Sequence, residues 1–180
     1  PNIAIVLAIS RREDMDAFGV TSVERARVAM DGEFDDEIVP VTVTNRRGET
    51  IFSKDEEPPN CNLDKLPTLR PAFAKDGTVT AATSSKISDG AAATVIMSEE
   101  KAAELGVTPL ATIVAHAMHS QEPGWFTTAP IGAISNVLQK AGWTVEDVDL
   151  FEVNEAFAAV TMAAMHEHAI PHDKMNVNGG

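Results

Sequence analysis

Short apolar runs alternate with helical stretches along the second half of the chain, from residue 88 onward. Residues 111–117 and 148–153 are apolar runs of strand length, a pattern typical of strands buried in a parallel sheet. The small residues at 91–97 predict a further strand, or a passage from helix to strand. Strands and helices that alternate with short links predict an α/β fold in which helices and sheets pack in layers.

Helix boundaries in the same half follow from local capping signals. A Ser at the N-cap, a Pro in the first turn and a Gly just past the last turn each suit backbone groups that a helix end leaves unpaired. Such signals predict three helices, which run from Ser98 to near Gly106, from Ala129 to Gly142, and from Asn154 to about His168. Pro171 prevents the last of them from continuing.

The first half has fewer regular signals. Ser10 and Glu13 form a capping-box pattern for one or two helices that run to about Met30, with Gly32 as a stop. The next segments are predicted as a strand with an edge-type proline, a polar solvated loop, a short helix or turn, and a tight turn: residues 37–43, 45–60, 66–73 and 75–78.

Composition limits the classes of partner. The 180 residues suit one domain of ordinary size or two small ones, and they carry 27 acidic against 14 basic residues, a net charge of −13. This balance argues against nucleic-acid binding and against docking on an anionic membrane, and no apolar run has the length of a membrane span. A phosphorylated ligand stays compatible, because backbone N–H groups or a local basic side chain hold phosphates on acidic proteins.

Cysteine content and the start of the chain bear on its compartment. A single cysteine, Cys61, rules out an internal disulfide, so a cytoplasmic location is the default prediction. Residues 1–9 are apolar but have neither a basic segment nor a Met. We interpret them as a buried segment of a longer chain rather than as a signal peptide.

Asn154 lies where the strand at 148–153 is predicted to meet the following helix, directly before Glu155-Ala156-Phe157. On position alone, an N-cap of the helix is the simpler interpretation. The same place also lies outside the carboxyl end of a strand, where ligands bind in α/β sheets. An amide there is able to donate a hydrogen bond or to hold a water.

A set of motifs, in order from about Ser10 to the last residue, resembles those of the thiolase family. Several are weak alone, but their order and spacing are specific as a set. They are residues 31–41, 69–81, 88–93, 129–130 and 141–143, the Val-Asn-Glu-Ala-Phe-Ala-Ala stretch at 153–159, and the Asn-Val-Asn-Gly-Gly stretch at 176–180. With this resemblance, a functional role for Asn154 is favoured over a plain cap.

The resemblance implies a chemistry and a fold. Thiolases join two acyl-CoA molecules into a 3-oxoacyl-CoA and free CoA by a reversible Claisen condensation, with coenzyme A esters as substrates and no prosthetic group. The implied fold is a layered α-β-α-β-α arrangement, incomplete here, of an enzyme that is normally a homo-oligomer (dimer or tetramer). Residues 1–86 correspond to most of its loop domain, residues 87–110 to the end of the N-terminal half and residues 111–180 to the start of the C-terminal half.

The resemblance also implies roles for individual residues. Asn154 corresponds to an asparagine that holds a water in an oxyanion hole, where donors stabilise the enolate that develops on the thioester oxygen. Ser85 corresponds to a serine that meets the pantetheine arm. Four residues correspond to walls of the CoA and thioester pocket: Phe73, Ala81, Ala156 and Phe157. Without the resemblance, the two phenylalanines would be interpreted as core packing and Ser85 as a turn hydroxyl.

The chain departs from the family pattern in several places. Residues 82–86 read Ala-Thr-Ser-Ser-Lys where members often have Gly-Asn-Ala-Ser-Gly, so that Lys86 replaces a small residue and either contacts a phosphate or points to solvent. Residues 125–128 stand where many short-chain members have a Met-Gly pair, which leaves the acyl-chain preference open. No residue corresponds to the nucleophilic cysteine, the second cysteine or the Gly-His-Pro histidine of the family.

This absence has consequences for the 180 residues taken alone. Removing the nucleophile removes the covalent step, so we expect no turnover from them. We also expect exposed sheet edges and apolar faces, which favour loose packing and poor solubility. Cys61, in an acidic, proline-flanked loop with nothing basic beside it, is interpreted as an incidental thiol.

Two alternatives from other classes remain. One is a non-catalytic module that binds CoA or a partner subunit. The other is a metal site built from the five histidines, and we predict none. His166 and His168 are two residues apart and so lie on different faces of a helix, and no cysteine or carboxylate stands at ligand spacing.

Overall fold

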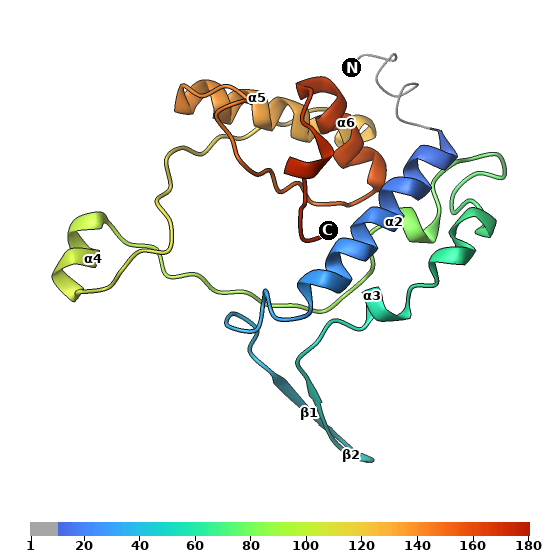
Figure 1. Ribbon diagram of the computed structural model, residues 1–180, viewed down its shortest axis with the longest axis horizontal. Coiled ribbons are helices and arrows are strands. Elements are labelled where there is room, and N and C mark those ends of the chain that lie inside the picture. The colour runs from blue at the N-terminus through green and yellow to red at the C-terminus, as the bar shows by residue number, and fades with distance from the viewer. Residues whose placement is uncertain (1–10) are drawn as a thin grey trace.

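The computed structural model describes residues 11–180, and α2 (Arg12–Ala29) is the longest helix within that range. The segment predicted as one or two helices is a single helix with Arg11 as its N-cap, while Ser10, the predicted cap, lies outside the described residues. Met15 and Phe18 are buried, and they pack against Ala158, the first residue of α6 (Ala158–His168). Helix α2 therefore runs beside the segment that carries the Asn-Glu-Ala-Phe motif (Figure 1).

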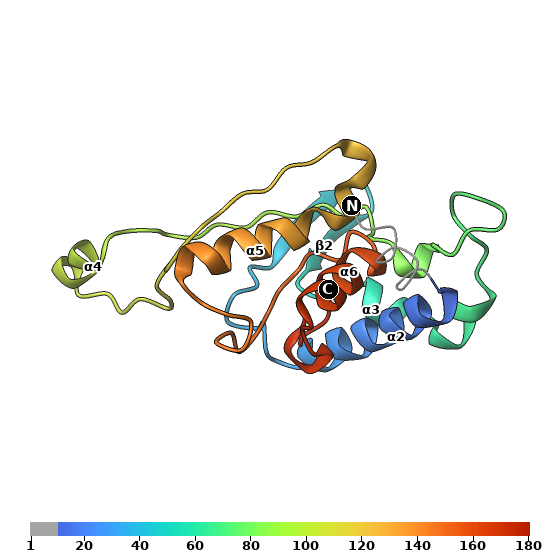
Figure 2. The ribbon, with the colours of Figure 1, turned by 90° about the horizontal axis from the view of Figure 1, so that it is seen from above.

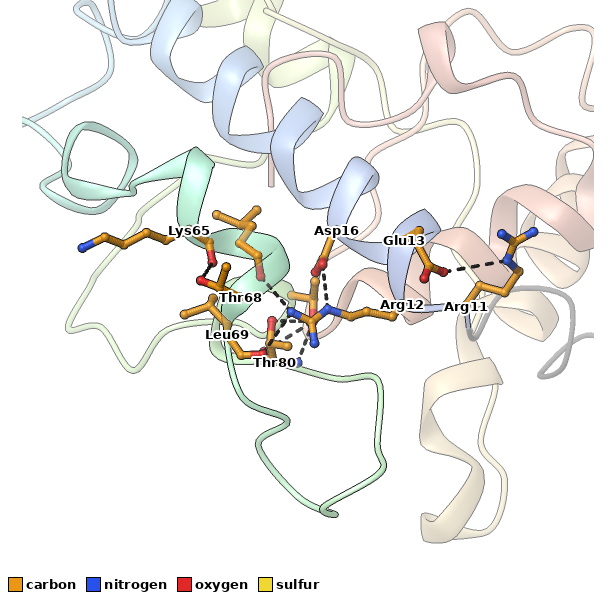
Figure 3. A network of polar contacts seen from close by, with 10 residues as sticks. Arg11, Arg12, Glu13, Asp16, Lys65, Thr68, Leu69 and Thr80 are labelled. Atoms are coloured by element: carbon orange, nitrogen blue, oxygen red, sulfur yellow. Dashed lines mark hydrogen bonds and ion pairs between the residues drawn. The ribbon is translucent and has the colours of Figure 1, made fainter.

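A partly buried ion pair fixes the first turns of α2 to residues 63–69. Arg12 Nε lies 2.6 Å from Asp16 Oδ2, and Arg12 Nη2 donates to the carbonyl oxygens of Leu66 and Leu69, at 2.7 and 3.1 Å. These carbonyls belong to the 3-10 helix η1 (Leu63–Thr68) and its C-cap. Figure 3 shows the guanidinium between the two segments. One arginine thereby pairs with one oxygen of the Asp16 carboxylate and with two backbone acceptors at once, while the buried Asp16 Oδ1 has no hydrogen-bond partner among the described residues.

The polar stretch predicted as a solvated loop contains a strand and a short helix, so that prediction was wrong. β1 (Val41–Asn45) and β2 (Gly48–Phe52) form an antiparallel hairpin in which Val41 faces Phe52. Gly48 has a φ of +124°, and Asn45 Oδ1 accepts a hydrogen bond from Arg47 N at 2.8 Å. Every residue of the two strands is exposed, and β2, which reads Gly-Glu-Thr-Ile-Phe, lacks the alternation of apolar and polar residues that marks a half-buried strand.

Helix α3 (Glu57–Asn60) follows the hairpin and is tied to α2 by Arg27. The guanidinium donates to the carbonyl of Pro58 at 2.8 Å and to that of Cys61 at 2.5 Å. Further on, Gly77 N donates to Ala74 O at 2.9 Å, which confirms a turn next to the predicted position. The 3-10 helix η2 (Ala81–Thr83) comes next and leads into the segment that carries Ser85.

Helix α4 (Glu99–Leu105) lies at the end of a long excursion away from the rest of the chain, as both ribbon views show (Figures 1 and 2). Its predicted boundaries are confirmed. Ser98 Oγ accepts from Lys101 N at 3.2 Å, and Gly106 ends the helix with a φ of +66°. Local capping alone thus defines this helix, which has little packing around it.

The strands predicted at 91–97, 111–117 and 148–153 are absent, since the hairpin is the one sheet within residues 11–180. The first two segments are extended and exposed, with Ile87 and Leu110 fully accessible beside them. In the third, a single parallel bridge joins Phe151 to Met175. A buried strand needs neighbours on both edges, and the described residues supply none for the first two runs and one short neighbour for the third. The expected exposure of apolar faces is confirmed.

The last third of the chain forms a helical layer. The 3-10 helix η3 (Pro123–Thr128) leads into α5 (Ala129–Ala141), which Gly142 ends with a φ of +73°, as predicted. Helix α6 packs beside α5 (Figure 1), and after it come Pro171 and the 3-10 helix η4 (His172–Lys174). A small core lies under the loops around them, built from Phe151, Ile170 and Met175.

Candidate active site

Two segments that are distant in sequence meet at the candidate site. Ser85 N donates to the carbonyl of Ala156 at 3.0 Å, and Ser84 forms an antiparallel bridge with Phe157. This pairing brings the loop after η2 against the segment before α6. Ser85 and Ala81 from the first segment therefore line the same cleft as Asn154 and Glu155 of the second.

The helix predicted to start at Asn154 starts at Ala158 instead, so the interpretation of Asn154 as an N-cap was wrong. Phe157 is the N-cap residue, with extended backbone (φ −146°). The residues before it are extended because they pair with Ser85 on one side and with Asn176 on the other. The Asn154 side chain is consequently exposed and lines a cleft rather than satisfying a helix end.

Aromatic rings gather around Phe157. The ring of Phe73 lies edge-on to it with a centroid distance of 6.0 Å, and the ring of Phe126 is tilted against it, also at 6.0 Å. Phe73 is 76 % exposed, so this contact is not core packing. Phe126 comes from η3, and no sequence signal beyond its departure from the family pattern indicated that it lies here. The three rings form one apolar wall.

A cleft of about 330 Å³ lies between α2, α3, the 81–88 segment and the Asn-Glu-Ala-Phe segment. Of the predicted site residues, Ala81, Ser85 and Asn154 line it, and Ala156, Phe157 and Phe73 do not. The latter three form the pairing and the ring cluster next to it. The α2 side of the cleft is formed by Phe18, Gly19, Ser22, Val23 and Ala26, which the sequence did not indicate.

Asn176 is a structural partner of the site that the sequence analysis missed. It is 1 % exposed and has a φ of +45°, a left-handed conformation that asparagine adopts more readily than most residues. Its Oδ1 accepts from Val153 N at 2.8 Å, and its Nδ2 donates to Val153 O at 2.8 Å and to Glu155 Oε1 at 2.7 Å. Asn176 thus holds the residues on both sides of Asn154. The Asn-Val-Asn-Gly-Gly motif, which begins with Asn176, was the available signal.

Glu155 continues this network to α2. Its Oε2 accepts a hydrogen bond from Ser22 Oγ at 2.8 Å, and Ser22 Oγ in turn accepts from Gly180 N at 3.1 Å. A Cβ on Gly180 would lie 2.6 Å from Glu155 Cδ, and one on Gly179 would lie 2.6 Å from Ser22 O. The glycine pair therefore lets the chain pass close to α2 and to the carboxylate.

Two titratable groups near the network have shifted pKa values. Burial, and then the charge of Glu155, raise the pKa of Glu152 above its ordinary value. Burial, and then the Arg25 guanidinium, lower the pKa of His172, against the smaller opposing effects of Glu155 and Asp173. The His172 ring stacks on Phe18 with centroids 5.0 Å apart. Arg25 itself donates to the carbonyls of His172 and Met175 at 2.8 and 2.7 Å.

Cys61 also lines the cleft. Nothing basic adjoins Cys61 in the sequence, but in the structure Arg27 from α2 donates to its backbone carbonyl. The contact is tertiary and has no counterpart in the loop sequence around Cys61.

Among residues 11–180, no three His, Cys, Asp or Glu side chains gather as metal ligands would. No helix in the same range is long and apolar enough to cross a membrane.

Comparison with known proteins defines the family. The model of the N-terminal domain of thiolase matches residues 2–100, and the model of the C-terminal domain of thiolase matches residues 107–180. The chain belongs to the thiolase family.

Curated relatives and solved structures agree with this. The chain is 46% identical to a probable acetyl-CoA acyltransferase of Staphylococcus aureus and 48% identical to an acetyl-CoA acetyltransferase of Chromobacterium violaceum, over 99% of its own length and 46% of theirs. It matches the acetyl-CoA acetyltransferase of Bacillus anthracis with a TM-score of 0.93 and 44% identity, and human mitochondrial 3-ketoacyl-CoA thiolase with 0.90 and 39%. Each match covers 98% of this chain and 46% of the solved chain.

These matches confirm the predicted fold class, a thiolase-like α/β fold that is incomplete in this chain. The chain spans about half the length of the relatives that it matches. They also account for the isolated extended segments. The relatives are about twice as long as this chain. When half of such a fold is considered alone, its strands lack the neighbours that the other half supplies.

Proposed function

We propose that the protein carrying this chain catalyses the thiolase reaction, in which an acyl-CoA and acetyl-CoA give a 3-oxoacyl-CoA and free CoA, reversibly. The family membership and the names of the curated relatives support this reaction class. The observation that carries it in the structure is the pairing of Ser85 with Ala156. Of the residues assigned to coenzyme binding and to the oxyanion hole, Ser85, Ala81 and Asn154 line one cleft, and Ala156, Phe157 and Phe73 lie next to it.

The proposed part of Asn154 is electrostatic. In the condensing direction, a base removes an α-proton from acetyl-CoA, and the resulting electron pair forms a bond to the acyl carbonyl carbon as the acyl thioester sulfur leaves. Negative charge develops on the thioester oxygen of acetyl-CoA before the bond forms. The exposed amide of Asn154 holds a water that donates to this oxygen, and a preorganised donor there lowers the barrier.

The proposed coenzyme site comprises the neighbouring residues. Ser85 contacts the pantetheine arm, Ala81 lines its path, and Ala156 with Phe157 forms the wall near the thioester, with Phe73 beside it. The small side chains at 81 and 156 leave room, and the aromatic rings offer an apolar face. Apolar walls with a few placed polar groups are the usual composition of small-molecule sites.

These 180 residues contribute the coenzyme wall and one oxyanion donor. The cysteines and histidine of the family correspond to no residue among them, and we propose that the residues alone do not turn over. The homo-oligomeric state, the cytoplasmic location and the division at residues 86 and 110 remain predictions. The family model of the N-terminal domain ends at residue 100, and that of the C-terminal domain begins at residue 107.

Thiolysis of acetoacetyl-CoA tests the proposal. The protein is expressed with whatever sequence its gene encodes on either side, and supplied with acetoacetyl-CoA and CoA. The expected result is loss of acetoacetyl-CoA with two acetyl-CoA formed for each one consumed. Tight CoA binding without any acetyl-CoA formed would overturn the enzymatic proposal in favour of a non-catalytic CoA-binding module.

A further inference from the structure

An ion pair joins two walls of the cleft. Lys86 Nζ lies 3.1 Å from Glu57 Oε2, and both residues line the cleft. Lys86 directly follows Ser85, the residue assigned to the pantetheine arm, and Glu57 is the first residue of α3. Their side chains are 57% and 53% exposed, so the pair is accessible to a ligand from solvent.

The charges around the cleft make Lys86 stand out. Among the described residues that line it, the acidic side chains are Asp55, Glu57 and Glu155, and the one cationic side chain is Lys86. Glu155 is engaged by Ser22 and Asn176, and Asp55 Oδ1 accepts from Glu57 N at 2.9 Å. A phosphorylated ligand that enters this cleft therefore meets several negative charges and a single positive one, on a chain whose net charge is −13.

We propose that Lys86 binds a phosphate group of the coenzyme, and that Glu57 is the partner which the phosphate displaces. This inference rests on the proposed function, since it assigns a ligand group within the same cleft. Exposed lysine–carboxylate pairs are weak, so exchanging the carboxylate costs little. A phosphate carries more charge and more acceptor oxygens than a carboxylate, so lysine gains by the exchange. Glu57 then competes with the ligand for Lys86. When no ligand is bound, Glu57 holds the Lys86 side chain over the cleft.

Calorimetric binding of three thiols to the full protein tests the inference. The thiols are CoA, 3′-dephospho-CoA and pantetheine, which carry successively fewer phosphates. In Lys86→Met, we expect the Kd for CoA to rise about fivefold at low salt, the upper end for one partly exposed charge pair, while the Kd for pantetheine stays unchanged. The response to 3′-dephospho-CoA shows which phosphate Lys86 holds: a retained effect assigns the pyrophosphate, and a lost one the 3′-phosphate.

Matched variants guard the interpretation. Lys101→Met removes a comparably exposed lysine that pairs with Glu104 at 2.7 Å on α4, away from the cleft, and should leave every Kd unchanged. Lys86→Arg keeps the charge and should bind CoA as the unchanged protein does. Glu57→Gln removes the competitor, and should tighten CoA binding by about twofold.

Several outcomes would overturn the inference. An unchanged Kd for CoA in Lys86→Met would place Lys86 in solvent only, and an equal rise for pantetheine would mean that the change disturbs the cleft itself. Either result leaves the thiolase proposal standing, because the unchanged protein still binds CoA. Failure of the unchanged protein to bind CoA would instead overturn both proposals.

Discussion

The side-chain amide of Asn176 lies 2.7 Å from Glu155 Oε1 and within hydrogen-bond distance of both backbone groups of Val153. The residue between Val153 and Glu155 is Asn154. Two motifs separated by some twenty residues in sequence are therefore one unit in space. The buried amide of Asn176 holds the backbone on both sides of the exposed Asn154. Ser22 connects the Glu155 carboxylate to α2.

Replacing Asn176 tests this unit. Asn176→Asp keeps the shape but removes the donor to Val153 O and sets a carboxylate against Glu155. Leaving buried acceptors unpaired beside a like charge should cost about 2–4 kcal/mol of the free energy of unfolding at neutral pH. Urea unfolding of the full protein measures this cost. Lowering the pH should reduce it, because the introduced carboxyl group donates a hydrogen bond again once it is protonated.

The control is Asn178→Asp, which changes the same residue type at an exposed position two residues away. It should shift the free energy of unfolding by no more than about 0.5 kcal/mol. Equal losses in the two variants would contradict the account, because they would show that the amide of Asn176 contributes nothing specific.

The glycine pair gives a second prediction. Gly179 has a φ of +82°, and an added Cβ would lie 2.6 Å from Ser22 O and 2.8 Å from Ala26 Cβ. Gly179→Ala should therefore lower the free energy of unfolding by about 2–3 kcal/mol, from strain and from displacement of the segment. Gly124→Ala is the matched control, because nothing lies within 4 Å of an added Cβ there. Thermal melting of both variants decides; equal melting temperatures would refute the close approach.

His172 predicts a pH dependence. Burial, and then Arg25, hold its folded-state pKa below the ordinary value of 6.5. As the pH falls through 6.5, the unfolded chain takes up a proton that the folded protein refuses, so stability decreases until the folded pKa is reached. Stability from this residue is thus fully present above 6.5 and lost below it.

The comparison that checks this is His172→Gln against His166→Gln, the latter an exposed histidine in α6. Chemical unfolding at a series of pH values around 6.5 should show a flatter slope for His172→Gln than for the unchanged protein, whatever its absolute stability. The same series on His166→Gln controls for the loss of a histidine at an exposed position. A slope that is identical in all three proteins would contradict the assigned shift.

Local signals were enough to predict α4 and α5 from the sequence. Ser98, Gly106 and Gly142 act on the helix ends next to them, so their effect requires no distant partner. The strand at 111–117 was wrong for the opposite reason. Its apolar residues indicate that the segment is suited to burial between neighbouring strands. Strand formation also requires those neighbours, and the described residues do not provide them.

The site residues that could be predicted from the sequence were those within the motifs that resemble the thiolase family. Ser85, Ala81 and Asn154 line one cleft, and the motifs indicated them. Ser22, Arg27 and Phe126 reach the site through tertiary contacts, and each is an ordinary helix or loop residue in its own surroundings. Asn154 was misplaced on a helix because a strand-to-helix junction and an extended, doubly paired segment have the same local sequence pattern.

The measurement that tests the central claim most directly is steady-state thiolysis of acetoacetyl-CoA by the full protein and by its Asn154→Ala variant. Loss of one oxyanion-hole donor predicts a fall in kcat of about 10²–10³-fold with little change in the KM for CoA. Asn62→Ala, at a position whose side chain makes no capping hydrogen bond, serves as the matched control and should retain full activity. An unchanged kcat in Asn154→Ala would contradict the account.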